Sequence, residues 1–512
     1  MMNRLLMGID VGSTNIKAAV FTEQGTEIAS HTVPNIPRQM DPEHESWLFW
    51  DPEELWGKVK QCMRECVKNS SSAGPVAAVA VTGMGMDGLP LDQEGNWLYP
   101  FISWKCSRTA STMEYWSQKL GTDKIFQISG KQPMAIDTLY RILWFREHKP
   151  ELYGQTWKWL QIEDYINYKL SGCVVTDYSM ASCTSLLDQR TRAWSKELLE
   201  AAGVKEEILP DIRASGSCIG TVSEETAKET GISPGAMVVL GGHDYSCAAV
   251  AAGVLEPGQI FDITGSWEML YACAGMEDFT GKVQENGFKF ESHVLPGRYA
   301  IFADVVSSSV LEWFKNQVVC RSGGGSDALW DDMIQMAQSA DPVKSGVFFL
   351  PTLMGKGCPS IDPKAMGAFV GLDGNTSLGA LCRAVFEGLN YQFREMLAAY
   401  EKISGRSVDQ IIVCGGAAKN TFWMQNKADI SGKTLIVPDN VETTLQGTAL
   451  LAGVGCGCYP DAGAAFQKTA RGAAVYHPQK TEYYDRYYEK YYLKLGALLK
   501  EFHHSIFQEF KA

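Results

Sequence analysis

The chain has 512 residues, of which 45% are hydrophobic and 21% are charged, and its formal net charge is −13. This length predicts about two to four domains, each able to bury a core without disulfides or structural metal ions. The acidic balance argues against a nucleic-acid-binding surface, although backbone N–H groups can still bind the phosphates of a nucleotide.

The fourteen cysteines are scattered and lie mostly in apolar or helical surroundings. Neither Cys62 with Cys66 nor Cys456 with Cys458 belongs to a two-pair spacing typical of a zinc site, so we expect reduced thiols in a cytoplasmic protein. Asp10 interrupts the N-terminal apolar run, which argues against a signal peptide, and every apolar segment is shorter than the ~20 residues that span a bilayer. We therefore expect neither a membrane nor a nucleic acid as partner.

The first half of the chain begins with a strand, a turn and a second strand. Residues 5–9 are apolar, residues 16–21 are strand-like, and the turn-like sequence DVGST at 10–14 separates them. Asp51, followed by Pro52 and two glutamates, predicts the start of a helix. We predict a strand at 75–82, a glycine-rich loop at 83–88, a mainly helical region at about 110–210, a strand at 236–240 and a helix at 248–254.

The second half repeats this opening. Residues 259–264 and 268–271 are strand-like, and the sequence DITGS at 262–266 resembles DVGS at 10–13. Because an acid, a β-branched residue and a Gly-Ser turn begin each half, we predict two related α/β domains that face each other. We predict an exposed glycine-rich loop at 322–326 and a strand with a glycine loop after it at 410–420. Beyond residue 475 we predict an amphipathic helix with Tyr484, Tyr488, Tyr491 and Leu495 on one face.

Asp244 is the most informative carboxylate of the chain. It lies in the sequence GGHDYSCAA at 241–249, between the strand and the helix predicted around it, and open α/β sheets hold ligands at such junctions. An aspartate that caps its own helix also explains the position and is favoured on this evidence alone, and both interpretations stay open. The neighbouring His243 has no serine or cysteine nucleophile motif with it, and we expect it to have a structural role.

Three glycine turns after predicted strands are candidates for phosphate binding: Gly12-Ser13-Thr14, Thr264-Gly265-Ser266 and Gly415-Gly416. Their backbone N–H groups can converge on a phosphate, although each turn alone is also ordinary hairpin chemistry. Walker-type and Rossmann-type glycine motifs are missing, so a nucleotide would bind in a cleft between domains. Asp10 suits Mg²⁺ or a hydrogen bond within its own turn, and Lys17 can reach either a phosphate or the solvent.

Taken together and in this order, the motifs resemble those of the FGGY carbohydrate kinases, which share the actin and hexokinase ATPase architecture. The resemblance is carried by the sequences GIDVGSTNIK at 8–17, the Trp104 and Arg108 pattern, GGHD at 241–244, TGS at 264–266, GAFVGL at 367–372, RAVFEG at 383–388 and GGAAKN at 415–420. It implies two actin-like (ribonuclease H-like) domains with a cleft between them. Residues 1–254 would bind the sugar and carry the first phosphate hairpin, residues 255–475 would bind adenosine, and residues 476–512 would form a closing helix.

The resemblance also implies a reaction, in which Asp244 accepts the proton of a sugar hydroxyl that attacks the γ-phosphate of ATP. It places Mg²⁺ at Asp10. It assigns ATP contacts to Gly12, Ser13, Thr14, Lys17, Thr264, Gly265, Ser266, Gly415, Gly416, Ala417 and Asn420, and sugar contacts to Met86, Asp87, Trp104, Arg108, Asp244 and Tyr245.

The chain departs from the family pattern around the sugar. An aspartate usual between Trp104 and Arg108 is missing, and Asp87 follows Met86 where some pentulose kinases have histidine. We therefore expect Asp87 to accept hydrogen bonds from a different set of sugar hydroxyls. Arg141 replaces a lysine three residues before Trp144 and is expected to keep a positive charge at the surface.

A ketopentose or ketohexose is the favoured substrate, because the chain is most similar in general pattern to the fuculose and xylulose kinase branches. Glycerol or another polyol is the alternative substrate, and a catalytically silent sugar sensor on the same fold is the alternative function. The oligomeric state stays open, with a homodimer as one candidate.

Overall fold

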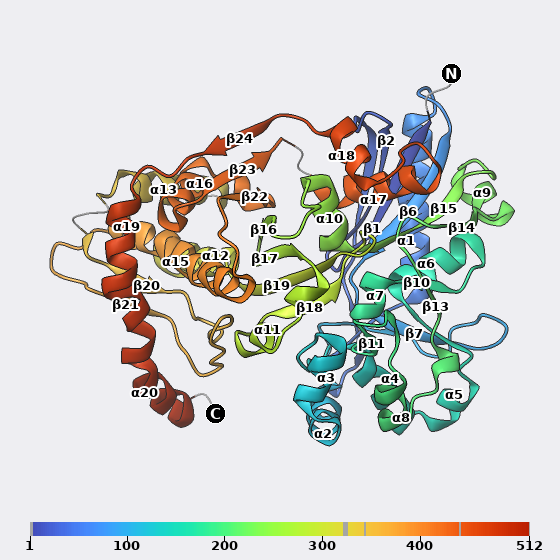
Figure 1. Ribbon diagram of the computed structural model, residues 1–512, viewed down its shortest axis with the longest axis horizontal. Helices are drawn as coiled ribbons and strands as arrows, with labels where there is room; N and C mark the ends of the chain where they lie inside the picture. The colour runs from blue at the N-terminus through green and yellow to red at the C-terminus, as the bar shows by residue number, and fades with distance from the viewer. Residues whose placement is uncertain (1–3, 321–325, 342–344, 440–441, 511–512) are drawn as a thin grey trace.

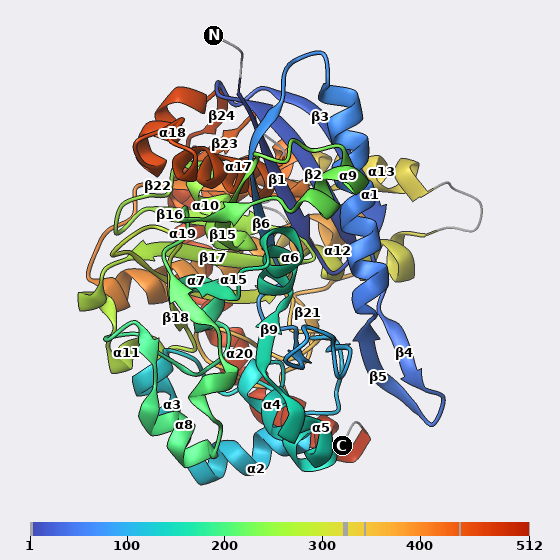
Figure 2. The same cartoon turned by 90° about the vertical axis from the view of Figure 1, so that its right-hand side faces the viewer.

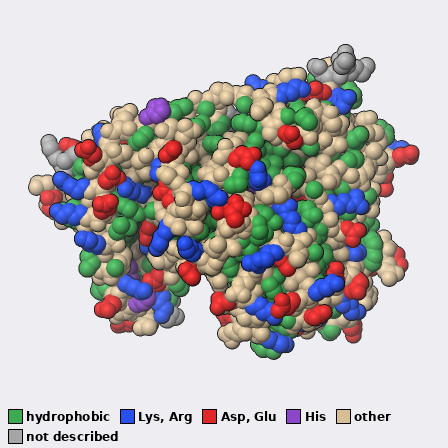
Figure 3. Space-filling view, in the orientation of Figure 1, with side chains coloured by type: hydrophobic (Ala, Val, Ile, Leu, Met, Phe, Trp, Pro, Cys, Tyr) green, Lys and Arg blue, Asp and Glu red, His purple; other side chains and the backbone are tan. Residues whose placement is uncertain are grey.

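The computed structural model describes residues 4–320, 326–341, 345–439 and 442–510. Within these ranges the chain forms two lobes, each built around a mixed β-sheet that helices cover (Figure 1). In the space-filling view the molecule is hollowed along its lower edge, between the part that carries the C-terminal helix and the part that carries the helices at 110–129 (Figure 3).

Among the described residues, the first sheet has the strand order β14-β15-β6-β1-β2-β3. Its centre is a hairpin in which β1 pairs antiparallel with β2, while β6 runs parallel to β1 and β15 runs parallel to β6. The strands are β1 (Leu5–Val11), β2 (Asn15–Thr22), β3 (Glu27–Pro34), β6 (Val76–Gly83), β14 (Cys218–Thr221) and β15 (Met237–His243).

The second sheet repeats this arrangement, with the described strands in the order β18-β19-β17-β16-β22-β23-β24. β16 pairs antiparallel with β17 and parallel with β22, as β1 does with β2 and β6. The predicted two-domain α/β fold is therefore confirmed. The strands are β16 (Ile260–Thr264), β17 (Trp267–Ala274), β18 (Lys289–Ser292), β19 (Tyr299–Val306), β22 (Gln410–Cys414), β23 (Thr434–Pro438) and β24 (Ala473–Tyr476).

Helix α1 (Pro52–Ser70) covers the outer face of the first sheet (Figure 2). It begins as predicted, because the Asp51 carboxylate accepts hydrogen bonds from the N–H groups of Glu53 and Glu54. Its apolar face buries Cys62 and Cys66 in the core of the first lobe. The two thiols are therefore packing groups, and their burial raises the pKa of each to about 12.

The first lobe has further elements, and those between residues 110 and 210 are mainly helices, as predicted. They are β4 (Arg38–Asp41), β5 (His44–Trp50), β7 (Gly88–Leu91), β8 (Phe101–Ile102), α2 (Ala110–Leu120), α3 (Thr122–Ser129), α4 (Thr138–His148), α5 (Pro150–Gln155), β9 (Lys158–Gln161), α6 (Ile162–Ser171), β10 (Val175–Asp177), α7 (Tyr178–Ser182), β11 (Leu187–Asp188), β12 (Ala193–Trp194), α8 (Lys196–Ala202), β13 (Asp211–Arg213) and α9 (Glu224–Thr230). The second lobe adds α11 (Gly281–Glu285), α12 (Ser308–Phe314), α13 (Ser326–Ser339), β20 (Phe348–Leu350), β21 (Ala368–Val370), α15 (Leu378–Ser404) and α16 (Thr421–Ser431).

Two helices, α10 (Asp244–Ala252) and α17 (Thr443–Gly455), lie between the sheets (Figure 1). α17 comes late in the chain, yet with α18 (Ala462–Thr469) it packs on the first sheet, where Leu445 and Ala449 share a core with Leu6. α10 packs on the second sheet through Ala248 and Ala249. Residues 443–469, inside the range expected for the C-terminal domain, therefore contribute to the core of the first lobe.

The two central helices cross at a glycine. A Cβ atom added at Gly447 of α17 would lie 1.8 Å from the carbonyl oxygen of Cys247 in α10. A Cβ at Gly8 of β1 would lie 2.3 Å from the carbonyl oxygen of Leu445. Both neighbours are backbone atoms, so the close approach of α10, α17 and β1 depends on the absence of these side chains.

The C-terminal helix has one turn that the tyrosine spacing did not predict. Helices α19 (Thr481–Tyr487) and α20 (Leu493–Phe510) are joined by a π-helical turn at Tyr488–Tyr492. The extra residue in this turn shifts the buried face, so Tyr492 is 5% exposed and Tyr491 is 40% exposed. The expectation that Tyr491 shares the packed face with Tyr484 and Tyr488 is therefore wrong.

The glycine-rich loop expected at 322–326 lies almost entirely outside the described residues, and α13 begins at its last position, Ser326. In the described part of the chain, no helix is both long and apolar enough to cross a membrane.

We expect Gly447→Ala to lower the free energy of unfolding by about 1–3 kcal/mol, because the added methyl group forces α10 and α17 apart. Gly57→Ala is the matched control, since Gly57 is also helical but nothing lies within 4 Å of a Cβ added there. This control should raise the unfolding free energy by about 0.5–1 kcal/mol through the higher helix propensity of alanine. Urea unfolding measures both, and equal stabilisation by the two changes would contradict the close crossing.

Candidate active site

Asp244 is the first residue of α10 and follows β15 directly. The helix-cap position belongs to His243, whose side chain makes no capping hydrogen bond, so Asp244 is not the cap residue. Its side chain is 38% exposed, and its Oδ1 accepts a hydrogen bond from the N–H of Tyr245 at 2.7 Å. The carboxylate is thus accessible at the carboxyl end of a parallel strand, where α/β sheets hold ligands.

The buried imidazole of His243 contacts this carboxylate. Its Nδ1 lies 2.8 Å from Asp244 Oδ1, and its buried ring packs against Tyr245 with 3.8 Å between the ring centroids. The ring also fills the space beside Gly85, where an added Cβ would lie 2.2 Å from the imidazole. Burial lowers the pKa of His243, but Cys183 and Asp244 outweigh that effect and raise it well above the usual value. The structural role expected for His243 is consistent with these contacts.

Asp10, near the end of β1, is a second carboxylate close to Asp244. Burial raises the pKa of Asp10 to about 7, the negative charge of Asp244 acts in the same direction, and Lys17 opposes both. Within the described part of the chain, Asp10 Oδ1 is buried without a hydrogen-bond partner. An unpartnered carboxylate oxygen suits Mg²⁺, which prefers oxygen ligands and keeps several waters. Since the described residues hold no cluster of three or more ligating side chains, phosphate and water oxygens would complete such a site.

Asn35, which lies outside the hairpin, donates hydrogen bonds to the first phosphate turn. Asn35 donates from its side chain to the carbonyl oxygen of Gly12 at 2.9 Å and from its backbone to that of Thr14 at 2.8 Å. Both contacts use carbonyl oxygens of the turn. Lys17 pairs with another residue: its Nζ lies 3.0 Å from an oxygen of Glu442, just before α17, and its side chain is 29% exposed.

The second phosphate turn is supported by a buried charged cluster. Lys427 Nζ lies 2.6 Å from Asp262 and also contacts Glu268, and all three side chains are fully buried. The hydroxyl of Thr264 donates to Asp262 at 3.1 Å and accepts from Lys427 at 3.0 Å. The expected phosphate contact through this hydroxyl is therefore not available, whereas Ser266 and Gly265 lie at the tip of the turn.

The predicted adenosine loop lies directly against the second turn. Gly415 has φ +106°, and an added Cβ would lie 2.4 Å from the carbonyl oxygen of Thr264. Gly415 and Gly416 are exposed, and Ala417 is partly buried. Asn420 Oδ1 accepts from the N–H of Trp423 at 3.1 Å and caps α16. Two of the three expected nucleotide segments are thus adjacent.

Asp87, an expected sugar contact, is bound in this structure by two side chains of the chain itself. Its Oδ1 lies 2.6 Å from Arg141 Nη1, and its Oδ2 accepts from Trp50 Nε1 at 2.6 Å. The side chains of Asp87 and Arg141 are both fully buried, so Arg141 is not at the surface either. Arg141 also donates to the carbonyl oxygens of Met86 and Ile102. The departure from the family pattern at Asp87 is therefore matched by a buried ion pair, in which the guanidinium satisfies the carboxylate.

Arg108, another expected sugar contact, lies in an aromatic cluster. Its guanidinium lies between Trp47 and Trp144, 4.8 and 5.1 Å from their ring centroids, and donates to Tyr99 Oη at 2.8 Å. The residue is 5% exposed. In this structure Arg108 therefore stabilises the aromatic cluster. Trp104 of the same pattern is partly buried and packs on the core of the first lobe.

Two charged residues at the lobe interface, Lys131 and Glu291, were not predicted. Tyr245 Oη donates to Glu291 Oε2 at 3.1 Å, and the other oxygen of Glu291 pairs with Lys131 at 2.5 Å. This pair joins the first lobe to β18. No local motif marks Lys131 or Glu291 in the sequence, since each acquires its role only from a partner about 160 residues away.

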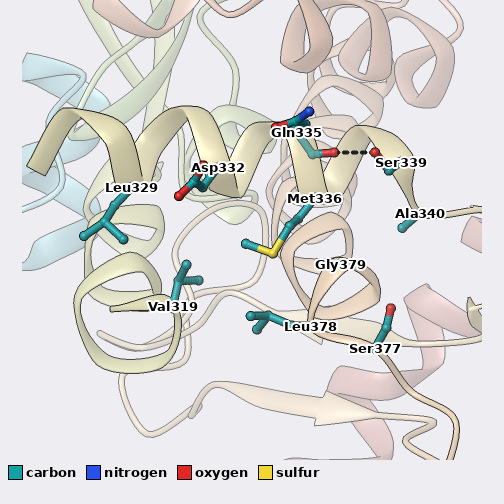
Figure 4. Close-up of a pocket in the computed structure, with 10 residues that line it drawn as sticks. All are labelled: Val319, Leu329, Asp332, Gln335, Met336, Ser339, Ala340, Ser377, Leu378 and Gly379. Atoms are coloured by element: carbon teal, nitrogen blue, oxygen red, sulfur yellow. Dashed lines mark hydrogen bonds between the residues drawn. The ribbon is translucent and has the colours of Figure 1, made fainter. Parts of the chain in front are cut away.

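A cavity of about 760 Å³ lies away from this site. It lies between α13 and the start of α15 and is lined by Asp332, Met336 and Leu378 among others (Figure 4). None of the predicted catalytic, nucleotide or sugar residues lines it. We therefore place the site by its carboxylates and turns and not by cavity size.

The N-terminal domain model of the FGGY family of carbohydrate kinases matches residues 5–251, and the C-terminal domain model matches residues 265–456. The chain belongs to the FGGY family of carbohydrate kinases. This FGGY kinase is 30% identical to the L-fuculokinase of Escherichia coli K12 over 89% of its length and 93% of the relative. It is 27% identical to the xylulose kinase of Bacillus subtilis 168 over 93% of each chain.

Solved structures share the fold. A xylulose kinase of Rhodospirillum rubrum superposes with a TM-score of 0.88 at 24% identity, covering 98% of this kinase and 100% of that chain. A Plasmodium falciparum glycerol kinase with ADP gives 0.86 at 19% identity and 98% coverage of both chains. The predicted carbohydrate kinase and ATP-binding phosphotransferase is therefore confirmed at the level of the family.

Arg141→Met should lower the free energy of unfolding by about 3–5 kcal/mol, because it leaves the Asp87 carboxylate buried without its partner. Lys60→Met breaks the more exposed Lys60–Glu229 pair of 2.8 Å and should cost at most about 1 kcal/mol. Urea unfolding of both variants compares the two pairs. Equal losses would contradict the assignment of Arg141 to a buried structural pair.

Asp10→Asn should stabilise the nucleotide-free kinase as pH rises. The folded-state pKa of about 7 lies above the ordinary value of 3.8, so the folded protein holds this proton more tightly and loses stability between about pH 4 and pH 7. The variant lacks that loss, so its free energy of unfolding should exceed that of the wild type by about 2–4 kcal/mol at pH 8 and by little at pH 4. Urea unfolding across this range measures it, with the exposed Glu94→Gln as control. A difference that does not change with pH would refute the raised pKa.

Proposed function

We propose that this FGGY kinase transfers the γ-phosphoryl group of ATP to a hydroxyl of a small sugar, with Asp244 as the general base. The observation that carries the proposal is the partly exposed Asp244 carboxylate, held by His243 at the carboxyl end of β15. A general base must lie within reach of the proton that it accepts, and such a proton acceptor belongs beside the substrate hydroxyl.

In the proposed step, the sugar hydroxyl oxygen attacks the γ-phosphorus in line with the bond to the β–γ bridging oxygen. The new O–P bond forms as that bond breaks, ADP leaves with the bonding electron pair, and the hydroxyl proton passes to a carboxylate oxygen of Asp244. Phosphoryl transfer depends mainly on positioning and charge stabilisation. The contact between His243 and Asp244 contributes to the positioning, because it fixes one carboxylate oxygen.

The nucleotide would lie across the three turns. Backbone N–H groups at Gly12, Ser13 and Thr14 and at Gly265 and Ser266 would bind the phosphates, and the loop 415–417 would contact adenosine. Asp10 would hold Mg²⁺, which neutralises phosphate charge when bound. For a phosphate to reach Lys17, its ion pair with Glu442 would have to open.

A neutral ketopentose or ketohexose is the proposed substrate class, supported by the relatives named L-fuculokinase and xylulose kinase. Glycerol or another polyol is the second candidate, favoured only by the shared fold of a glycerol kinase. A silent sugar sensor is disfavoured by the accessible Asp244 and the unpartnered oxygen of Asp10. A homodimer stays a prediction.

Asp244→Asn should lower kcat by at least about 100-fold, because an amide cannot accept the hydroxyl proton while its size is unchanged. A coupled assay of ADP release, run with a panel of ketoses and polyols, measures turnover. ATP binding, followed by calorimetry, should change less than about threefold. Glu94→Gln, an exposed carboxylate outside the site, serves as the control variant.

Unchanged turnover in Asp244→Asn would refute the base assignment. A sugar that binds to the wild type without raising ADP release above background would favour the sensor over the kinase.

A further inference from the structure

A cavity of about 340 Å³ lies where the two lobes meet, and it contains none of the predicted sugar contacts. Gln132 and Met134 line it from the first lobe, and Trp267, Lys289 and Asp304 line it from the second. Its volume is at the lower end of the range of about 300–1,000 Å³ typical of small-molecule pockets, so a small sugar fits it better than a large ligand.

This cavity adjoins the second phosphate turn through Trp267. Trp267 comes directly after Ser266 of the second phosphate turn and is 48% exposed. Lys289 Nζ lies 5.3 Å from the ring centroid of Phe302, and that ring lies 5.2 Å from the ring of Tyr245, the neighbour of Asp244. The packed rings of Phe302 and Tyr245 therefore lie between Lys289 on the cavity wall and the general base.

Lys289 and Asp304 form an ion pair on the wall of this cavity. Lys289 Nζ lies 2.6 Å from Asp304 Oδ1, and the two side chains are 16% and 29% exposed. The Lys289 ammonium lowers the pKa of Asp304, so this carboxylate is ionised near neutral pH. Among the described residues, no other hydrogen bond is made by Lys289 Nζ or by the second oxygen of Asp304. Two N–H donors and one carboxylate oxygen are thus available to a ligand.

The cavity wall is balanced in charge. Its charged side chains are Lys289, Asp304 and Lys356, and Lys356 is paired with Glu395 at 2.6 Å. A ligand carboxylate would therefore meet cations that are already neutralised and would lie beside Asp304. Hydroxyl groups suit the wall better, because each can accept from an ammonium and donate to a carboxylate.

We propose that Lys289 and Asp304 together determine sugar specificity by binding neighbouring hydroxyl groups at the non-reacting end of a neutral sugar. The proposal rests on the kinase function above and deepens it. The reacting hydroxyl lies at Asp244, and the chain of the sugar extends along the aromatic layer into the cavity. The wall selects uncharged ketoses and polyols over sugar acids, because an acid group adds a charge that the wall cannot compensate.

The test compares Lys289→Met and Asp304→Asn with the wild type in the coupled ADP assay, using D-xylulose, L-fuculose, D-fructose, glycerol and D-gluconate. Each variant should raise KM for the best neutral sugar by about 10–100-fold, since it removes charge-assisted hydrogen bonds. KM for ATP should stay within about twofold. The double variant should raise KM for the sugar little more than the single variant with the larger increase, because the two side chains bind the sugar as a unit.

Lys433→Met is the matched control, since Lys433 forms a 2.8 Å pair with Glu401 in the same lobe at 19% and 28% exposure. It should leave both KM values unchanged. Asp304→Asn leaves the wall with a net positive charge, so it should also raise the kcat/KM of D-gluconate relative to the best neutral sugar. Unchanged sugar KM in both single variants, or equal increases for sugar and ATP, would overturn the proposal.

Calorimetry with the same sugars separates this proposal from the proposed function. If a sugar binds to the wild type without turnover, the kinase function fails, and loss of that binding in Lys289→Met and Asp304→Asn still supports the specificity pair. Retained binding in both variants overturns the pair. The absence of both turnover and binding with every sugar would overturn both proposals.

Discussion

The close crossing of α10 and α17 is the constraint on which the site depends. Gly447 allows the backbone of α17 to touch that of α10, and Gly8 allows β1 to touch α17 in turn. Asp244 is the first residue of α10, so its distance from Asp10 on β1 is fixed by this stack of backbones. The charge of Asp244 acts on Asp10 for the same reason. A side chain at either glycine would therefore disturb the relation between the two carboxylates as well as the core.

The aspartates of the two paired hairpins have different surroundings. Asp262 lies one residue pair further from its turn than Asp10 does, and the buried Lys427 neutralises it. Lys17, the cation that acts on Asp10, is itself paired with Glu442, and one oxygen of Asp10 is unpartnered among the described residues. The duplicated hairpin has thus become a rigid support in the second lobe, while the first lobe retains a carboxylate suited to a cation.

The sequence allowed the fold and the backbone of the site to be predicted, because these depend on local patterns. The two hairpins, the start of α1 and the strand before Asp244 all follow from apolar runs, turns and caps. The side-chain partners of Asp87, Arg108 and Arg141 could not be predicted because they are remote in the sequence. Trp50 lies 37 residues before Asp87, Trp47 lies still further before Arg108, and burial of a charged group depends on such partners. A π-helical turn likewise leaves no periodic signal, which is why Tyr491 was placed on the wrong face.

The same reasoning explains why the sugar cavity was missed. Lys289 and Asp304 lie on neighbouring strands, fifteen residues apart, in sequence that reads as ordinary amphipathic strand. Their role appears only when the first lobe closes the cavity with Gln132 and Met134. The phosphate turns and Asp244 must satisfy a reaction common to the family, so their sequence is recognisable. The cavity wall needs only to match one sugar, and many combinations of paired charges can do so. Specificity in this kinase is therefore expected in the residues that carry the least recognisable sequence.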